Sequence, residues 1–158
     1  MNSDQSLRKH LLELLDGAHA HAAFDDVVAD FPAGKRGAIP KGMPHSGWML
    51  LEHLRIAQHD ILDFARNPKY REMKWPDDYW PASPEPPDEK AWDRSVAAFR
   101  RDRRAVQTLT TDPKVKLEAR IPHGSGQTYL REILLVIDHN AYHVAELVLL
   151  RRLLGIWP

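Results

Sequence analysis

The chain has 158 residues, in which 22 basic and 22 acidic side chains balance and give a sequence pI near 7.1. This balance leaves no basic face for nucleic acid or for an anionic membrane, so we expect neither partner. Cysteine is absent, which excludes disulfides, thiolate metal ligands and a cysteine nucleophile; a transition-metal site would have to use His, Asp and Glu. The length fits one domain, residues 1–158, with a sizeable core.

The N-terminal residues are polar and run into an amphipathic pattern, without the basic and apolar regions of a signal peptide. The longest apolar run, Ile133 to Ile137, is too short to span a bilayer. We therefore expect a soluble, cytoplasmic protein that has no membrane partner.

The first predicted helix runs from Ser3 or Asp4 to Phe31, with Ser3 as its N-cap. Gly17 is expected to weaken this helix without ending it. His21 and Asp25 lie on or beside the apolar stripe. The favoured interpretation is a hydrogen-bonded pair in the core, and the alternative is that both residues line a pocket.

The second predicted helix begins at Ser46, a good N-cap, and ends at Asn67-Pro68. With about 100° per residue, one face of this helix carries a mixed set of apolar and titratable side chains. The members of that face are Met49, His53, Ile56, Ala57, Asp60 and Phe64. A histidine and an aspartate on a face that is otherwise apolar indicate either a core hydrogen bond or a site.

Residues 67–90 combine tryptophan, tyrosine and proline, which is typical of an ordered loop packed over the protein rather than of a flexible linker. Trp75, Tyr79 and Trp80 are expected to shape the rim of a pocket. A third helix is predicted from Pro87 or Asp88 to Leu109, and a fourth from Gln127 to Leu154. Four long helices and little strand signal predict an all-α fold, a four-helix bundle with long ordered loops.

The fourth predicted helix is apolar yet carries two histidines four residues apart, His139 and His143, on or beside its inner stripe. Together with His53 they offer three imidazoles from two helices, enough for a facial metal site that keeps a coordination position open. Ordinary hydrogen-bonded core histidines are the alternative. Burying three imidazoles without partners costs several kcal/mol, roughly, and a bound metal would remove that cost. The residues alone leave both interpretations open.

Carboxylates that could orient a ligand imidazole are Asp60, Glu146 and Asp138, although each could equally be an ordinary surface acid. His45 has no matched partner in the pattern and is expected at the surface or in a loop. The imidazole donors suit zinc, nickel, copper and iron alike. We expect a divalent ion, with zinc or nickel foremost.

Two stretches resemble the DinB-like, or YfiT-like, superfamily. The first is Gly47-Trp48 through Glu52-His53 to His59-Asp60. The second runs from Gly126-Gln127 through Asp138-His139-Asn140 and Tyr142-His143 to Trp157, and the Trp75-Pro to Trp80-Pro loop fits a branch of the family. The resemblance implies a four-helix bundle in which three histidines hold a divalent metal. By position these histidines are His53, His139 and His143.

What the resemblance implies for activity is broader, because some members are thiol S-transferases and others resemble metal-dependent hydrolases or isomerases. We expect Lewis-acid catalysis on a small-molecule substrate, with a low-molecular-weight thiol as one candidate. The alternative is a non-catalytic, metal-stabilised stress-response or binding protein. The fourth helix is apolar nearly all round, at Leu134, Leu135 and Leu149 as well as inside, which fits a homodimer interface.

Overall fold

A computed structural model of the protein describes residues 2–17 and 20–157. The described residues form an all-α protein without a β-strand, and an isolated bridge joins Arg120 to Thr128. The α-helices are α1 (Ser3–Asp16), α2 (Phe24–Val28), α3 (Gly47–Arg66), α4 (Ala91–Thr111) and α5 (Tyr129–Leu153). Two short 3₁₀ turns, Ala33–Lys35 and Asp77–Tyr79, lie in the connections.

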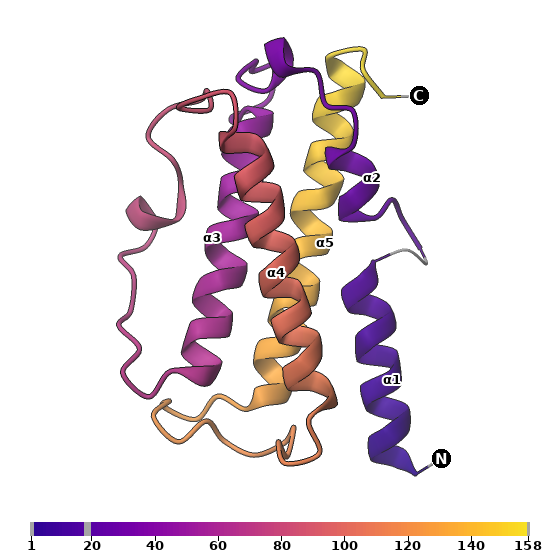
Figure 1. Ribbon diagram of the computed structural model, residues 1–158, viewed down its shortest axis with the longest axis vertical. Coiled ribbons are helices and arrows are strands. Elements are labelled where there is room, and N and C mark those ends of the chain that lie inside the picture. The colour runs from indigo at the N-terminus through magenta and orange to yellow at the C-terminus, as the bar shows by residue number, and fades with distance from the viewer. Residues whose placement is uncertain (1, 18–19, 158) are drawn as a thin grey trace.

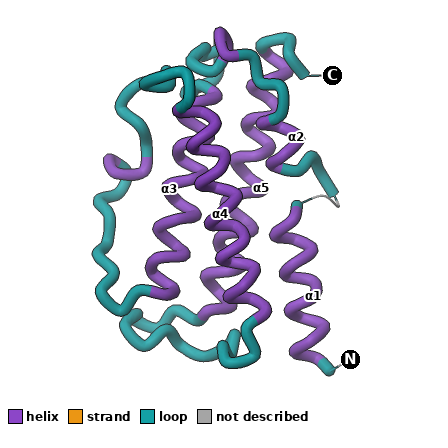
Figure 2. The backbone as a smooth tube through the Cα atoms, in the orientation of Figure 1, coloured by secondary structure: helices purple, strands orange, loops and turns teal. Residues whose placement is uncertain are grey.

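The four long helices lie side by side along the long axis of the molecule (Figure 1). Helix α3 packs against α4 and α5, and α1 packs against the same two helices, so α3 and α1 occupy opposite corners. The short α2 continues the α1 corner and packs against α5. The long connections, drawn as loops in Figure 2, pass over both ends of the bundle and along the outer side of α3. The predicted all-α fold is confirmed.

The prediction of one unbroken first helix is wrong. Helix α1 ends at Asp16, because Gly17 adopts the left-handed conformation (φ 74°) and its N–H closes the turn on the Glu13 carbonyl. Glycine adopts the left-handed conformation at little energetic cost, so Gly17 serves as the C-cap of α1 instead of continuing the helix. The predicted helix also covered residues 18 and 19, which lie outside the described part of the chain. The N-cap is Asn2, in a capping box with Gln5, rather than Ser3.

The other helix boundaries follow local chemistry. Ser46 caps α3 by accepting a hydrogen bond from the Met49 N–H, and α3 ends at Arg66, as predicted. Helix α4 starts at Ala91, three or four residues later than the predicted start at Asp88 or Pro87. The reason is Asp88, whose side chain accepts from the Lys90 N–H and whose carbonyl accepts from Ala91, so that the chain turns before the helix begins.

The core consists of two apolar clusters. One is centred on Trp48, Leu51, Phe99 and Leu147, and the other on Leu11, Leu62, Val106, Ile133 and Val136. Near the junction of these clusters, α3 and α5 contribute a group of buried or half-buried polar side chains: His53, Gln58, Asp60, His139, Asn140 and His143. A polar layer therefore crosses the middle of the bundle.

Helix α5 is long and apolar enough to cross a membrane by length and composition alone. In the fold it is a central helix that packs against α1, α2 and α3 and buries Ile133, Val136, Leu147 and Leu150. Its apolar character is thus accounted for by the bundle core on one side. The opposite side carries the exposed leucines Leu134, Leu149 and Leu153.

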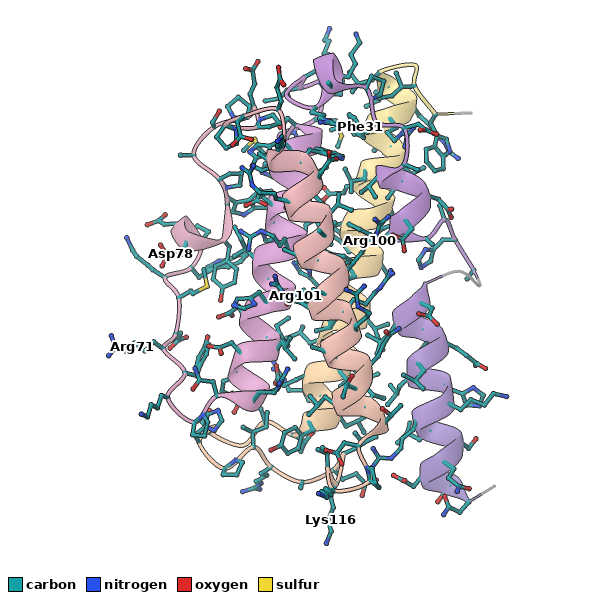
Figure 3. All side chains as sticks on the ribbon, in the orientation of Figure 1. Phe31, Arg71, Asp78, Arg100, Arg101 and Lys116 are labelled. Atoms are coloured by element: carbon teal, nitrogen blue, oxygen red, sulfur yellow. The ribbon has the colours of Figure 1, made fainter. Side chains whose placement is uncertain are left out.

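Residues 67–90, hereafter the strap, run along the outer side of α3. Figure 3 shows Arg71 and Asp78 on the far side of this loop, away from the helices. The strap is fixed to α3 at several points: Tyr70 and Tyr79 both donate to the Asp60 carboxylate, and the Ser46 hydroxyl donates to the Pro84 carbonyl at 2.5 Å. The strap is ordered and packed over the protein, as its composition predicted.

Candidate metal centre

Three histidines from two helices converge in the polar layer. His53 comes from α3, and His139 and His143 come from successive turns of α5. One ring nitrogen of each lies within 4.8 Å of the others, and Nε2 of His139 is 3.1 Å from Nε2 of His53. His53 and His143 are buried, at 2% and 8% exposure. The sequence spacing alone thus identified the three side chains that the fold brings together.

The orientation of the His53 ring is fixed by a hydrogen bond at its edge and by an aromatic ring stacked on its face. Its Nδ1 lies 2.9 Å from the carbonyl oxygen of Tyr79, and a carbonyl can only accept a hydrogen bond. Nδ1 must therefore carry the proton, which leaves a lone pair on Nε2 of the neutral ring. The indole of Trp80 stacks on the same ring at 3.9 Å with an interplanar angle of 3°.

His143 is oriented by a carboxylate. Its Nδ1 donates to Glu146 Oε2 at 2.6 Å, one helical turn further along α5. This contact again directs the Nε2 lone pair toward the other two rings. Burial, reinforced by His53 and His45, lowers the pKa of His143 from the ordinary 6.5 to about 4, so the ring is neutral near pH 7.

His139 completes the cluster with a less constrained ring. Its Nδ1 is buried and has no hydrogen-bond partner among the described residues. Burial, followed by the proximity of His143 and His53, lowers the pKa of His139 to about 4, although Asn140 and Asp138 oppose the shift. Asn140 is itself held by donating to Gln58, which donates to the Phe99 carbonyl.

The donor set fits a divalent cation. Two Nε2 lone pairs are aimed inward by fixed partners on Nδ1, and the third ring presents its Nε2 to the same point. Neutral imidazoles are good ligands for zinc, nickel, copper and iron. Histidine ligands in metal sites commonly donate the other ring N–H to a carbonyl or carboxylate, which is the pattern seen for His53 and His143.

A pocket of about 280 Å³ opens beside the three histidines. Its walls are largely apolar, from Ala57 and Ile61 of α3, Leu135 of α5, and the strap residues Trp75 and Tyr79. Trp75 is 69% exposed, and its ring lies 5.2 Å from the Tyr79 ring, centroid to centroid, at an interplanar angle of 60°. The predicted rim residues Trp75 and Tyr79 thus line this pocket, whereas Trp80 sits behind it against His53.

The three carboxylates expected near the cluster behave differently. Glu146 binds a ring nitrogen directly, as described. Asp60 contacts no imidazole; its two oxygens accept the hydroxyls of Tyr70 (2.9 Å) and Tyr79 (2.6 Å). Burial, followed by the hydrogen bond to Asp60, raises the pKa of both tyrosines, which stay neutral donors. Asp138 is exposed.

The favoured prediction of a His21–Asp25 core pair is wrong. His21 is exposed and its Nδ1 lies against the Ala22 carbonyl, whereas Asp25 is bound by Arg100 (labelled in Figure 3) and Arg103 of α4. The break after Asp16 moves this segment out of helical register with α1. His21 lines a separate, mainly apolar cavity of about 140 Å³ between α1, α4 and α5, away from the histidine cluster.

His45 is the nearby residue that the sequence did not single out. It stacks on the outer face of Trp80 at 3.8 Å, so that His45, Trp80 and His53 form a three-ring stack. Its Nδ1 is buried without a partner in the described structure. Burial lowers the pKa of His45, and Glu146 opposes that shift. The only available sequence signal was its position one residue before the α3 N-cap.

Comparison with known proteins gives one match. The family model of the DinB superfamily matches residues 8–147, which include α2, α3 and α4 in full, α1 from residue 8 onward and α5 up to residue 147. No curated protein matches the chain. Nor does any solved structure. A family match over most of the chain, together with the all-α fold and the three-histidine cluster, identifies this protein as a member of the DinB superfamily.

Proposed function

We propose that this protein binds one divalent metal ion through His53, His139 and His143 and uses it as a Lewis acid in a small-molecule reaction. The observation that carries the proposal is the pair of Nδ1 contacts, to the Tyr79 carbonyl and to Glu146, that direct two lone pairs to the point faced by His139. Zinc or nickel is the expected ion. Three protein ligands leave a further coordination position for a substrate group or water.

When bound, such an ion lowers the pKa of a coordinated thiol or water and so supplies a nucleophile near neutral pH. The protein's own contribution is to hold three neutral imidazoles in place and to limit water around them. Glu146 accepts the Nδ1 proton of His143 and so strengthens Nε2 of this neutral ring as a metal ligand. The Tyr79 carbonyl does the same for His53, and Trp80 shields the face of that ring.

The pocket walls indicate the kind of substrate. Ala57, Ile61, Leu135 and Trp75 surround the space beside the imidazoles, so a substrate would place an apolar portion there. Two nearby carboxylates already have partners, Asp60 with two tyrosines and Glu146 with His143. Thiol transfer to an apolar electrophile therefore fits this pocket better than a reaction that needs a free carboxylate base.

Activity assays would test the proposal. Protein reconstituted with zinc or nickel is assayed with a panel of low-molecular-weight thiols and an aromatic electrophile, and in parallel with simple esters and amides. We expect metal-dependent thiol transfer that His143→Ala abolishes and that Trp75→Ala weakens several-fold through KM. Turnover equal in the apo-protein and the metal-loaded protein would contradict a metal-dependent reaction.

The second candidate is a metal-stabilised dimer without catalytic activity. Leu134, Tyr142, Leu149 and Leu153 are 46–65% exposed and fall within about 100° of one another around α5. An apolar stripe of this kind favours a helix-to-helix contact with a second copy. Sedimentation of wild type and Leu149→Glu would reveal such a dimer, and loss of the dimer without loss of turnover would separate the two candidates.

A further inference from the structure

Asp60 and His53 lie seven residues apart on α3, which is close to two helical turns. Both side chains therefore face the same direction, toward the strap. Asp60 is 9% exposed, and its carboxylate has two neutral donors, the hydroxyls of Tyr70 and Tyr79. A buried carboxylate needs such partners, because an unpaired charge in this position would be costly.

The two tyrosines differ in what else they contact. Tyr79 carries, on its own backbone, the carbonyl that accepts the proton of His53 Nδ1 at 2.9 Å. The next residue, Trp80, supplies the indole stacked on the His53 ring. Tyr70, near the start of the strap, packs against the Phe64 ring and donates its hydroxyl to Asp60.

A chain of contacts thus runs from Asp60 through the Tyr79 hydroxyl and backbone to His53. The Asp60–Tyr79 hydrogen bond, at 2.6 Å, fixes the side chain of the residue whose carbonyl selects the His53 tautomer. Small displacements at that carbonyl would turn the ring or release the proton to Nε2. Either change would remove the lone pair that faces His139.

We propose that Asp60 and Tyr79 are positioning residues for the metal centre: Asp60 holds Tyr79, and the Tyr79 carbonyl keeps the proton of His53 on Nδ1 so that Nε2 can bind the ion. This inference rests on the proposed metal-binding function. In this arrangement Asp60 acts on the metal site through Tyr79 and then His53. The sequence had suggested a direct contact between Asp60 and an imidazole.

The test compares three variants: Tyr79→Phe, Asp60→Asn and Tyr70→Phe. Tyr70→Phe is the matched control, because it removes one hydroxyl from the same carboxylate on a tyrosine whose carbonyl does not face His53. Zinc affinity is measured by competition with a chromophoric chelator. The His53 tautomer of each apo-protein is measured by long-range ¹H–¹⁵N NMR correlation of the imidazole.

Changing an outer contact of a metal ligand commonly weakens metal binding about 10–100-fold. We expect Tyr79→Phe and Asp60→Asn to lower zinc affinity about tenfold and to shift His53 toward the tautomer protonated on Nε2. Tyr70→Phe should stay within about twofold of wild type and keep the Nδ1–H tautomer. Equal losses in Tyr79→Phe and Tyr70→Phe, or an unchanged His53 tautomer in Tyr79→Phe, would overturn the inference.

Failure of the proposed function would look different. If wild type itself binds no zinc, the metal site is refuted and the affinity comparison has no basis. The tautomer measurement is made without metal and still decides whether Asp60 and Tyr79 control His53. Thermal unfolding of the three variants is recorded alongside, since similar midpoints for Tyr79→Phe and Tyr70→Phe attribute a difference in zinc affinity to positioning rather than to general loss of stability.

Discussion

Two sides of α5 border empty volume, and the two spaces differ in kind. Toward α3 and the strap, a pocket of about 280 Å³ contains three imidazoles, two of which have a fixed partner on Nδ1. Toward α1, a cavity of about 140 Å³ is lined mainly by apolar side chains such as Phe24, Phe99 and Val144. The titratable groups there are already bound, since Arg103 pairs with Asp25 and His21 contacts a backbone carbonyl.

The difference shows that space alone does not define a functional site. The α1-side cavity has volume, but its polar groups bind one another or the backbone. The α3-side pocket has converging lone pairs that only a cation or a proton donor can satisfy. Changes on the α3 side should therefore alter metal binding, and changes on the α1 side should alter stability alone.

The largest expected effect is from loss of a histidine ligand. A ligand present at 1,000 times its Kd stabilises the folded state by about 4 kcal/mol, so zinc should raise the Tm of wild type by many degrees. Replacing His53, His139 or His143 with Ala should abolish that rise in differential scanning calorimetry. His21→Ala, on the α1 side, should keep it. A zinc-induced rise that survives all three single substitutions would place the ion elsewhere.

A smaller effect is expected from Glu146→Gln. The amide can still contact His143 Nδ1 but lacks the charge that strengthens the ring as a ligand, so zinc affinity should fall about tenfold or more. Asp25→Asn removes a carboxylate that binds two arginines on the α1 side. Isothermal titration should show unchanged zinc affinity for Asp25→Asn; equal losses in both variants would argue against a role for Glu146 at the metal.

The lowered histidine pKa values predict a pH dependence for the apo-protein. In the folded state His139 and His143 protonate near pH 4, whereas in the unfolded chain they protonate near 6.5. The unfolded state therefore binds more protons in between, so stability is fully present above pH 6.5 and falls as the pH drops toward 4. Urea unfolding of wild type and His143→Gln at a series of pH values would measure this, and the variant should lose less stability.

The smallest effect on the metal site is expected from filling the α1-side cavity. Ala141 lines it, and Ala141→Leu adds apolar volume where the core has a void. Cavity filling commonly adds about 0.5–2 kcal/mol of stability. Chemical denaturation should show that gain, and the zinc affinity should stay within about twofold of wild type. A large change in zinc affinity would mean that the two sides of α5 are coupled.

The sequence predicted the part of the molecule in which periodicity decides structure. The convergence of His139 and His143 and the inward face of His53 follow from the helical repeat, and the Ser46 cap follows from its residue type. The prediction of one unbroken first helix failed because Gly17 can either continue a helix or end it. Tertiary packing decides between the two outcomes. The His21–Asp25 prediction failed with it, since both residues were placed by extending that helix.

Contacts made by loops could not be read from spacing. The Tyr79 carbonyl at His53 is a backbone group, and its position depends on how the whole strap folds over α3. The same holds for the stack of His45 on Trp80, which joins the loop that precedes α3 in the chain to the loop that follows it. Asp60 was correctly placed on the His53 face, but its partners come from the strap, so its contacts with Tyr70 and Tyr79 became visible only in the fold.

The central claim is that three imidazoles of this chain hold one metal ion. The most direct test is elemental analysis by mass spectrometry of wild type and His139→Ala, purified without an affinity tag and dialysed against trace zinc. We predict about one divalent ion per chain in wild type and a metal content near zero in the variant. Wild-type protein that remains metal-free under these conditions, or a variant with the same metal content as wild type, would contradict it.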